Sequence, residues 1–169
     1  RAAARFSPTR FAHVCIFLFA NVYGMPGTAA ELSPAAQLGR QIFNDASLSA
    51  SGKQSCASCH DPAHAYAPGN KLAVQLGGAD GQASGYRATP SLRYLERNPP
   101  FRFDEEGAPN GGINWDGRAA SLAEQAERPF LAAHEMANAS TDEVVERLRN
   151  GSYAETFRHV FGAAIFTQP

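Results

Sequence analysis

Apolar positions at helical spacing alternate with polar, glycine-rich and proline-rich connections after residue 30. The first predicted helix begins at Ser33-Pro34, because serine suits the N-cap and proline suits the first helical position. Leu38, Ile42 and Phe43 then fall on one face of the helix. The helix is expected to end at Asn44-Asp45.

Three later helices are predicted from serine-x-x-glutamate patterns, which are typical of capping boxes at helix starts. They run from Ser121 to about Arg128 before the breaker Pro129, from Ser140 to Asn150-Gly151, and from Ser152 to Gly162. A shorter helix is expected from Leu92 to Arg97. No strand pattern is visible, so we predict an all-α fold of short helices and long loops.

Two of the long loops have distinctive compositions. Gly77 to Gly81 is predicted to be flexible, and it lacks the Lys-Ser/Thr ending of a phosphate-binding loop. The acidic run Asp104-Glu105-Glu106 is predicted to be a solvated loop.

The sequence Cys56-Ala57-Ser58-Cys59-His60 has the C-x-x-C-H pattern at which haem c is attached. The two thiols add to the vinyl groups of the porphyrin, and their spacing places both sulfurs on one side of a short helical turn. His60 follows directly and is the predicted proximal ligand of the iron. A thioredoxin-like redox pair or half of a zinc site is the alternative. No βαβ pattern lies nearby and no cysteine follows, so we predict one covalent haem c.

The ligand on the other side of the iron decides between electron transfer and peroxide chemistry. The available side chains are His64, His134, Met136 and His159, and we expect His64 to be a surface residue. Glu135 is either an acid–base group for peroxide cleavage or an ordinary surface carboxylate.

Trp115 is the only tryptophan, and its residue type alone leaves two interpretations open. It is either an aromatic anchor of the core or a stepping stone for an electron beside the haem.

The start of the chain has the composition of an export leader. Three arginines precede an apolar run from Phe11 to Tyr23, and Thr28-Ala29-Ala30 offers small residues for cleavage. We therefore expect a signal peptide over residues 1–30, a haem c domain over 31–169 and a periplasmic location. The apolar run is too short to favour stable membrane insertion, and a retained N-terminal anchor is the alternative.

The charge balance indicates which class of macromolecule the chain is suited to bind. The chain has 15 basic and 16 acidic side chains, and three of the basic ones precede residue 31. The expected mature part therefore has 12 basic against 16 acidic side chains, a net charge of −4 with neutral histidines. This balance disfavours a nucleic-acid partner, which binds a basic face.

From Leu38 to about Phe166 the chain resembles the N-terminal half of the bacterial di-haem cytochrome c peroxidase and MauG family. Four segments carry the resemblance in order: LGRQIFNDASLSASGKQSCASCHDPAHAY, RATPSLRYL, WDGRAASLAEQAERPF and HEMAN. The resemblance implies a cytochrome c-like fold whose haem on Cys56, Cys59 and His60 is the peroxidatic one.

The resemblance also implies two further roles. Glu135 matches the distal-pocket acid that assists peroxide cleavage, and Trp115 matches the tryptophan on the electron path between two haems. We therefore expect an oxidoreductase that reduces hydrogen peroxide to water, with electrons from a small c-type cytochrome or a cupredoxin. A mono-haem electron-transfer protein and a MauG-like oxidase of a protein substrate are the alternatives.

The chain departs from the family pattern at three places. It has no second C-x-x-C-H, so we expect it to be a partial product. The stretch GGADGQAS before the RATPSL segment lacks the distal histidine of some family members, which favours the MauG-like subgroup or constitutively open peroxidases. Ala88 stands where the family has an asparagine that helps to hold calcium, so calcium is only an open alternative.

Overall fold

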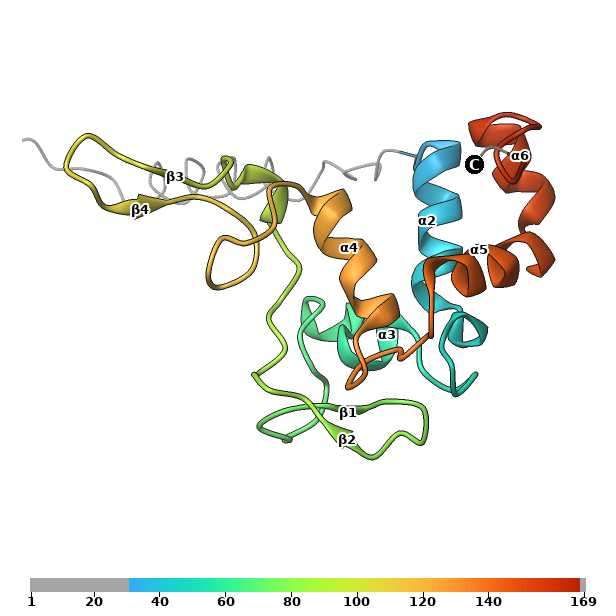
Figure 1. Cartoon of the computed structure of the whole chain (residues 1–169), viewed down its shortest axis with the longest axis horizontal. Helices are drawn as coiled ribbons and strands as arrows, with labels where there is room; N and C mark the ends of the chain where they lie inside the picture. Colours follow the sequence, from blue (N-terminus) through green and yellow to red (C-terminus); the bar gives the residue numbers. More distant parts are fainter. Residues whose placement is uncertain (1–30, 168–169) are drawn as a thin grey trace, which may run out of the picture. The chain divides into compact units, whose positions relative to one another are not determined.

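A computed structural model describes residues 31–167, and the predicted signal peptide over 1–30 lies outside them. Within the described range, five α-helices form the framework, joined by three short 3-10 turns (Figure 1). The helices are α2 (Pro34–Asn44), α3 (Cys56–Cys59), α4 (Leu122–Leu131), α5 (Thr141–Asn150) and α6 (Ala154–Phe161). The turns are η1 (Ala46–Leu48), η2 (Pro62–His64) and η3 (Leu95–Arg97). No helix of this range is long and apolar enough to cross a membrane.

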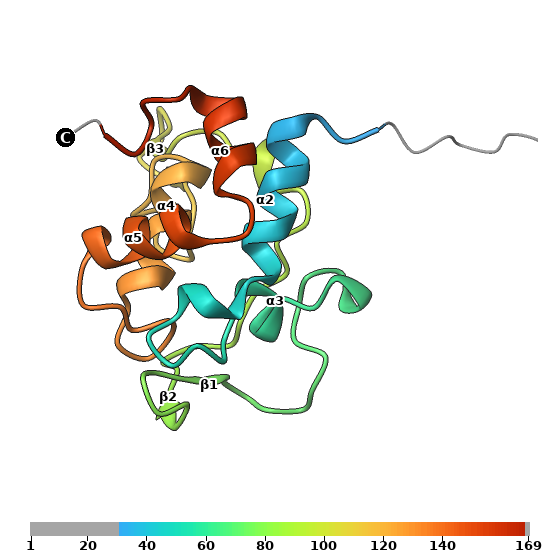
Figure 2. The same ribbon diagram turned by 90° about the vertical axis from the view of Figure 1, so that its right-hand side faces the viewer.

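Helix α2 has the boundaries that its sequence predicts. Ser33 is the N-cap, and its hydroxyl oxygen accepts a hydrogen bond from the Ala36 amide at 3.2 Å. Pro34 occupies the first turn, where main-chain N–H groups have no partner within the helix. The N–H that proline lacks therefore costs the helix no hydrogen bond. Leu38 is buried, and α2 packs against α3 and α6 (Figure 2).

Helices α4 and α5 begin with the predicted serine caps. The hydroxyls of Ser121 and Ser140 accept hydrogen bonds from the amides of Glu124 and Glu143 at 3.1 and 3.2 Å. Each glutamate reaches one residue further back than in a standard capping box, because its carboxylate accepts the amide of the residue before the serine. These contacts satisfy amides that a helix start otherwise leaves without partners.

Three helix boundaries differ from the prediction. The helix expected from Leu92 to Arg97 is only the 3-10 turn η3, which begins at Leu95. Pro129 lies inside α4, which continues to Leu131. Proline costs the helix one hydrogen bond there, but the carbonyls of Arg128, Pro129 and Phe130 all accept amides from residues beyond the helix. The N-cap of α6 is Tyr153 rather than Ser152, and its side chain makes no capping hydrogen bond. Gly162 ends α6 as predicted.

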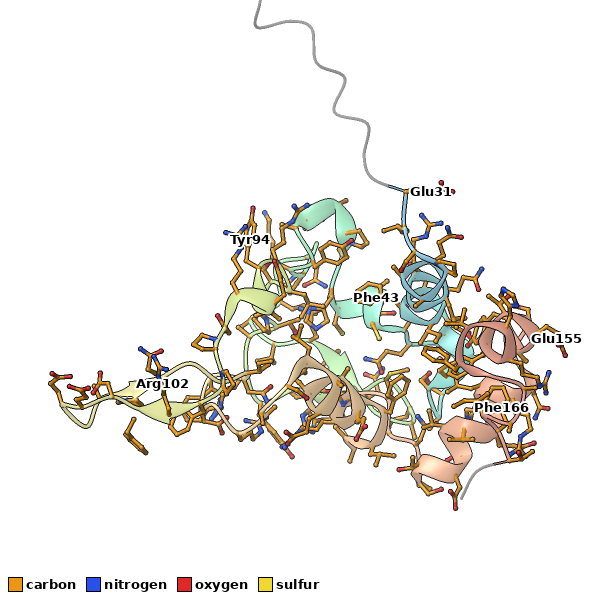
Figure 3. All side chains as sticks on the ribbon, turned by 90° about the horizontal axis from the view of Figure 1, so that it is seen from above. Glu31, Phe43, Tyr94, Arg102, Glu155 and Phe166 are labelled. Carbon is orange, nitrogen blue, oxygen red and sulfur yellow. The ribbon has the colours of Figure 1, made fainter. Side chains whose placement is uncertain are left out.

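The helical class is confirmed, but the strictly all-α prediction is wrong. The described part also contains two short antiparallel hairpins, β1 (Leu76–Gly77) with β2 (Ala83–Ser84) and β3 (Arg102–Phe103) with β4 (Pro109–Asn110). Each strand has two residues, too few to show the alternation by which strands are recognised in a sequence. The acidic run forms the exposed turn between β3 and β4, and Figure 3 shows Arg102 on this hairpin.

The buried core is small and is contributed mainly by α2, α5, the start of α6 and the segments around η1 and after α4, with Ile113 in the loop before α4. Most of its large members are aliphatic or aromatic: Leu38, Leu48, Ile113, Met136, Val144, Tyr153 and Phe166. Tyr153 also has a polar partner, because its hydroxyl donates to the Asp45 carboxylate at 2.6 Å. This bond joins the end of α2 to the start of α6.

The pKa values of the two partners reflect this bond. Burial acts to raise the pKa of Asp45, but hydrogen bonds from Ser47 and Tyr153 outweigh it and hold the pKa below its usual range. Burial and the neighbouring carboxylate both raise the pKa of Tyr153.

We expect Tyr153→Phe to lower the free energy of unfolding by about 1–2 kcal/mol at pH 7, because it removes a hydrogen bond to a charged acceptor. Since the pKa of Asp45 is lowered in the folded state, its stabilising contribution is complete above the unfolded pKa of about 4. It is lost as the pH falls through the folded pKa. Denaturant unfolding of wild type and variant should therefore show a difference that shrinks in acid.

Tyr94→Phe is the matched control, because the Tyr94 side chain is 63% exposed. It should leave the unfolding free energy almost unchanged at both pH values. A Tyr153→Phe effect of equal size at pH 7 and below pH 3 would contradict the assigned role of Asp45.

Candidate haem site

The C-x-x-C-H motif forms a single helical turn. The Ser58 hydroxyl accepts the Ser55 amide at 3.0 Å at its start, and the His60 amide donates to the Cys56 carbonyl at 2.9 Å at its end. Cys56 and Cys59 are both free thiols and both partly buried. One turn of helix therefore presents two thiols and an imidazole in sequence, as the prediction for covalent haem requires.

The imidazole of His60 is oriented by a backbone carbonyl. Its Nδ1 lies 3.0 Å from the carbonyl oxygen of Tyr66, and a carbonyl only accepts, so Nδ1 carries the proton. The lone pair of Nε2 is then available to a metal. This is the usual way in which a protein fixes the tautomer of a metal-binding histidine.

The loop that supplies this carbonyl has an unusual backbone. Ala65 and Tyr66 have φ values of +56° and +59°, a region that residues other than glycine rarely adopt. The Ser91 hydroxyl donates to the Ala65 carbonyl at 2.6 Å, and the ring of Phe43 (Figure 3) packs edge-on against the ring of Tyr66. These contacts hold the strained turn in place.

Glu135 lies in the turn that follows α4, and the structure brings it near the motif. Burial raises the pKa of both Cys56 and Cys59, and the negative charge of Glu135 raises both further. The Glu135 side chain is 44% exposed, and its Oε1 lies 3.8 Å from Nε2 of His134. A carboxylate therefore stands within electrostatic reach of both attachment sites.

The β1–β2 hairpin fixes the main chain of this turn. The Gly78 amide donates to the Glu135 carbonyl at 2.7 Å. Gly77 approaches so closely that a Cβ atom there would collide with the His134 carbonyl and lie 2.9 Å from the Glu135 carbonyl. The segment predicted to be flexible is thus a hairpin that packs against the turn of Glu135.

Trp115 lies in a separate turn, between Asn114 and Gly117, and its ring is 70% exposed. The Arg87 guanidinium covers this ring at 3.8 Å from the ring centre. The preceding residue, Tyr86, stacks on His134 with ring centres 4.2 Å apart. Tyr86 and Arg87 therefore connect the turn of Trp115 to the turn of Glu135.

The remaining histidines and Met136 occupy other positions. His64 is exposed, as predicted, and pairs with Asp61 at 2.8 Å. His159 is exposed on α6. Met136 is 4% exposed and belongs to the core, where its carbonyl accepts the Ala50 amide at 2.8 Å.

A cavity of about 270 Å³ opens beside the motif and is lined by Cys59, Ser58, Gln54 and Leu76 among others. Nε2 of Gln54 donates to the Leu76 carbonyl at 3.3 Å and lies 3.8 Å from Sγ of Cys59. Oε1 of Gln54 is buried without a partner in the described part of the chain. Free thiols on one turn and an oriented imidazole fit a covalently attached haem c, and the cavity borders the Cys59 end of that turn.

Sequence reasoning did not identify Gln54, Gly77, Tyr86 or Arg87 as parts of this site. Arg87 opens the RATPSL segment and Tyr86 directly precedes it, so that segment was a usable signal. The other two residues act through contacts with distant segments, for which the local sequence offers no signal.

This helical unit with its C-x-x-C-H turn has the features of a c-type haem domain, and comparisons with known proteins specify the family. The family model described as di-haem cytochrome c peroxidase matches residues 33–169. The methylamine utilization protein MauG of Paracoccus denitrificans is 40% identical over 164 residues, which cover 92% of this chain and 42% of that protein. The cytochrome c551 peroxidase of Nitrosomonas europaea is 34% identical over 137 residues, covering 76% of this chain and 34% of that protein.

A solved structure agrees with these sequences. The diheme peroxidase BthA of Burkholderia thailandensis superimposes with a TM-score of 0.73 at 32% identity, over 83% of this chain and 38% of that one. The chain therefore belongs to the di-haem cytochrome c peroxidase family, which is a family of haem c enzymes. It spans about two fifths of the length of the MauG protein that it matches.

We expect Gly77→Ala to destabilise the protein by about 1–3 kcal/mol, because the added methyl group overpacks the contact with the turn of Glu135. Thermal unfolding of the haem-loaded protein measures this loss. Gly39→Ala is the matched control, since a Cβ at Gly39 meets nothing within 4 Å. That change should be neutral or slightly stabilising within a helix, and equal losses in both variants would refute the assigned packing.

Proposed function

We propose that this chain is the peroxidatic haem domain of a larger di-haem oxidoreductase that reduces hydrogen peroxide to water. Cys56 and Cys59 hold the haem covalently, and His60 is its proximal ligand. The bound haem supplies the iron at which peroxide is reduced. The observation that carries the proposal is the attachment turn itself, with two free thiols and an oriented imidazole, and the Glu135 turn beside it: Gly77 packs against both the Glu135 carbonyl and Gln54, whose Nε2 lies 3.8 Å from Sγ of Cys59.

Glu135 acts as the acid–base group of the reaction. Cleavage of the O–O bond to give water requires a proton to leave one peroxide oxygen and reach the other. A single carboxylate beside the haem accepts that proton and returns it. The contacts of Gly77 and Gly78 with the main chain of Glu135 support this role, because they hold the turn that carries the carboxylate.

Two electrons and two further protons complete the reduction of one peroxide to two waters. We propose that the electrons come from a small c-type cytochrome or a cupredoxin and pass by way of Trp115. The exposed ring of Trp115 suits contact with another domain or protein. Residues 1–30 direct export in this proposal, which places the reaction in the periplasm.

A MauG-like function is the second candidate, in which oxidising power is delivered to a protein substrate instead. The identity to MauG of Paracoccus denitrificans, 40%, exceeds the 34% identity to the cytochrome c551 peroxidase of Nitrosomonas europaea. Oxidation of a donor cytochrome in a fixed ratio to peroxide distinguishes peroxide reduction from this alternative. A mono-haem electron carrier would instead show a low-spin spectrum that peroxide leaves unchanged.

The proposal is tested by producing the full chain in a bacterial host that attaches haem c and mixing the ferric protein with peroxide. We expect a high-spin spectrum that changes on mixing. Glu135→Gln should slow this change by about 10²-fold or more, because the amide keeps the shape of the side chain and cannot shuttle the proton.

Glu127→Gln provides the control for this experiment, since Glu127 is an exposed carboxylate on α4. It should leave the rate as in wild type. A Glu135→Gln variant that reacts at the wild-type rate would remove Glu135 from the mechanism.

Trp115→Phe tests the electron route. We expect the peroxide-dependent spectral change to keep its rate, while re-reduction of the oxidised domain by an added donor slows about tenfold or more. The reason is that phenylalanine is much harder to oxidise than tryptophan. Stopped-flow absorbance separates the two steps, and an unchanged re-reduction rate would exclude Trp115 from the route.

A further inference from the structure

Asn138 is the last residue of the HEMAN segment and is 4% exposed. Its side-chain amide Nδ2 donates to the Leu48 carbonyl at 2.8 Å and to the Phe130 carbonyl at 2.9 Å. Leu48 ends the turn η1, which precedes the haem motif, and Phe130 lies in the last turn of α4. One buried side chain therefore joins both ends of the Glu135 turn to a segment 90 residues earlier.

The orientation of this carboxamide is determined by its partners. Both neighbours of Nδ2 are carbonyl oxygens, so a rotated amide would place an acceptor against two acceptors. Oδ1 has no hydrogen-bond partner in the described part of the chain. A buried acceptor without a partner is costly, so the contribution of Asn138 lies in its two N–H groups.

Besides the side chain of Asn138, two main-chain hydrogen bonds hold the Glu135 turn to other segments. The Ala50 amide donates to the Met136 carbonyl at 2.8 Å, and the Gly78 amide donates to the Glu135 carbonyl at 2.7 Å. The Glu135 turn is thus held on one side by the segment before the haem motif and on the other by the β1–β2 hairpin. Figures 1 and 2 show the chain between α4 and α5 beside the cyan segment that leads into α3.

The turn itself needs this support. Ala137, which separates Met136 from Asn138, has a φ of +57°, in the left-handed region that disfavours an alanine. The Asn138 amide also donates to the Phe130 carbonyl at 2.9 Å, so main chain and side chain of Asn138 converge on one acceptor. Tertiary contacts thereby maintain a backbone that the local sequence does not favour.

We propose that Asn138 is the positioning residue for Glu135: it fastens the Glu135 turn to the chain that leads into the haem motif. The inference rests on the proposed function, in which Glu135 transfers a proton at the haem. Asn138 does not touch the peroxide itself. It sets the distance between the carboxylate and the haem attachment turn, on which proton transfer depends.

The first test combines Asn138→Ala with Glu135→Gln in the haem-loaded full chain. Asn138→Ala alone should slow the reaction with peroxide about tenfold or more. In the Glu135→Gln background, the same change should slow it less than threefold, because residues that act through one another are not additive. A full tenfold loss in both backgrounds would overturn the proposal, since Asn138 would then act without Glu135.

The second test is amide hydrogen exchange, which does not depend on activity. In Asn138→Ala, the amides of Ala50 and Gly78 should exchange about tenfold faster or more. The Asp61 amide, which donates to the Ala67 carbonyl on the proximal side, should keep its wild-type rate. Unchanged exchange at Ala50 would overturn the proposal, and so would equal acceleration at Asp61, because the effect would then be general destabilisation.

Asn44→Ala is the matched control, because the exposed Asn44 side chain also donates to a carbonyl, that of Arg40 at 2.8 Å. It should change neither the peroxide rate nor the exchange at Ala50. If Asn138→Ala does not accumulate with haem, Asn138→Leu roughly keeps the side-chain volume and removes both donors without adding a charge, with the same expected results. If Glu135→Gln alone has no effect, the proposed function fails, and the exchange rates decide the role of Asn138 separately.

Discussion

The hydrogen bond between the His60 imidazole and the Tyr66 carbonyl is the constraint on which the haem site depends. It determines which ring nitrogen carries the proton, and so which nitrogen can bind iron. The carbonyl reaches His60 only because Ala65 and Tyr66 adopt left-handed backbone conformations. Ser91 and Phe43 then hold that turn from two other segments of the chain. These contacts therefore maintain an unfavourable backbone conformation at Ala65 and Tyr66, and that conformation gives the His60 imidazole its orientation.

The turn that carries Glu135 is held by different contacts. Glu135 stands on a turn whose main chain is held by the β1–β2 hairpin and by the segment before the motif, through Gly78, Ala50 and Asn138. Hydrogen bonds to carbonyl oxygens hold this turn beside the buried side chain of Met136. Such bonds fix distances more sharply than apolar packing does, because they depend on both length and angle. This precision suits the proton transfer that we propose for Glu135.

Local chemistry decided which features could be predicted from the sequence. The start of α2, the serine caps of α4 and α5 and the C-x-x-C-H turn depend on residues within about four positions of each other, and they were predicted correctly. The role of Gly77 and the stacking of Tyr86 on His134 depend on contacts between distant segments. Pro129 inside α4 belongs to the same class, because the carbonyls at the end of that helix are satisfied by residues beyond it. The role of Trp115 stays a prediction. Its exposed ring contacts Arg87, and this single contact does not define an electron route.

The spacing of these contacts along the chain has a consequence for the order of assembly. His60 and Tyr66 are six residues apart, whereas Asn138 and Leu48 are separated by 90. Closing a short loop costs less entropy than closing a long one, and local contacts form earlier during folding. The proximal loop can therefore form while the Glu135 turn is still detached from the motif. A chain that folds in this order keeps one face of the cysteine turn open until the Glu135 turn packs against it, which leaves room for a bulky porphyrin at the two thiols.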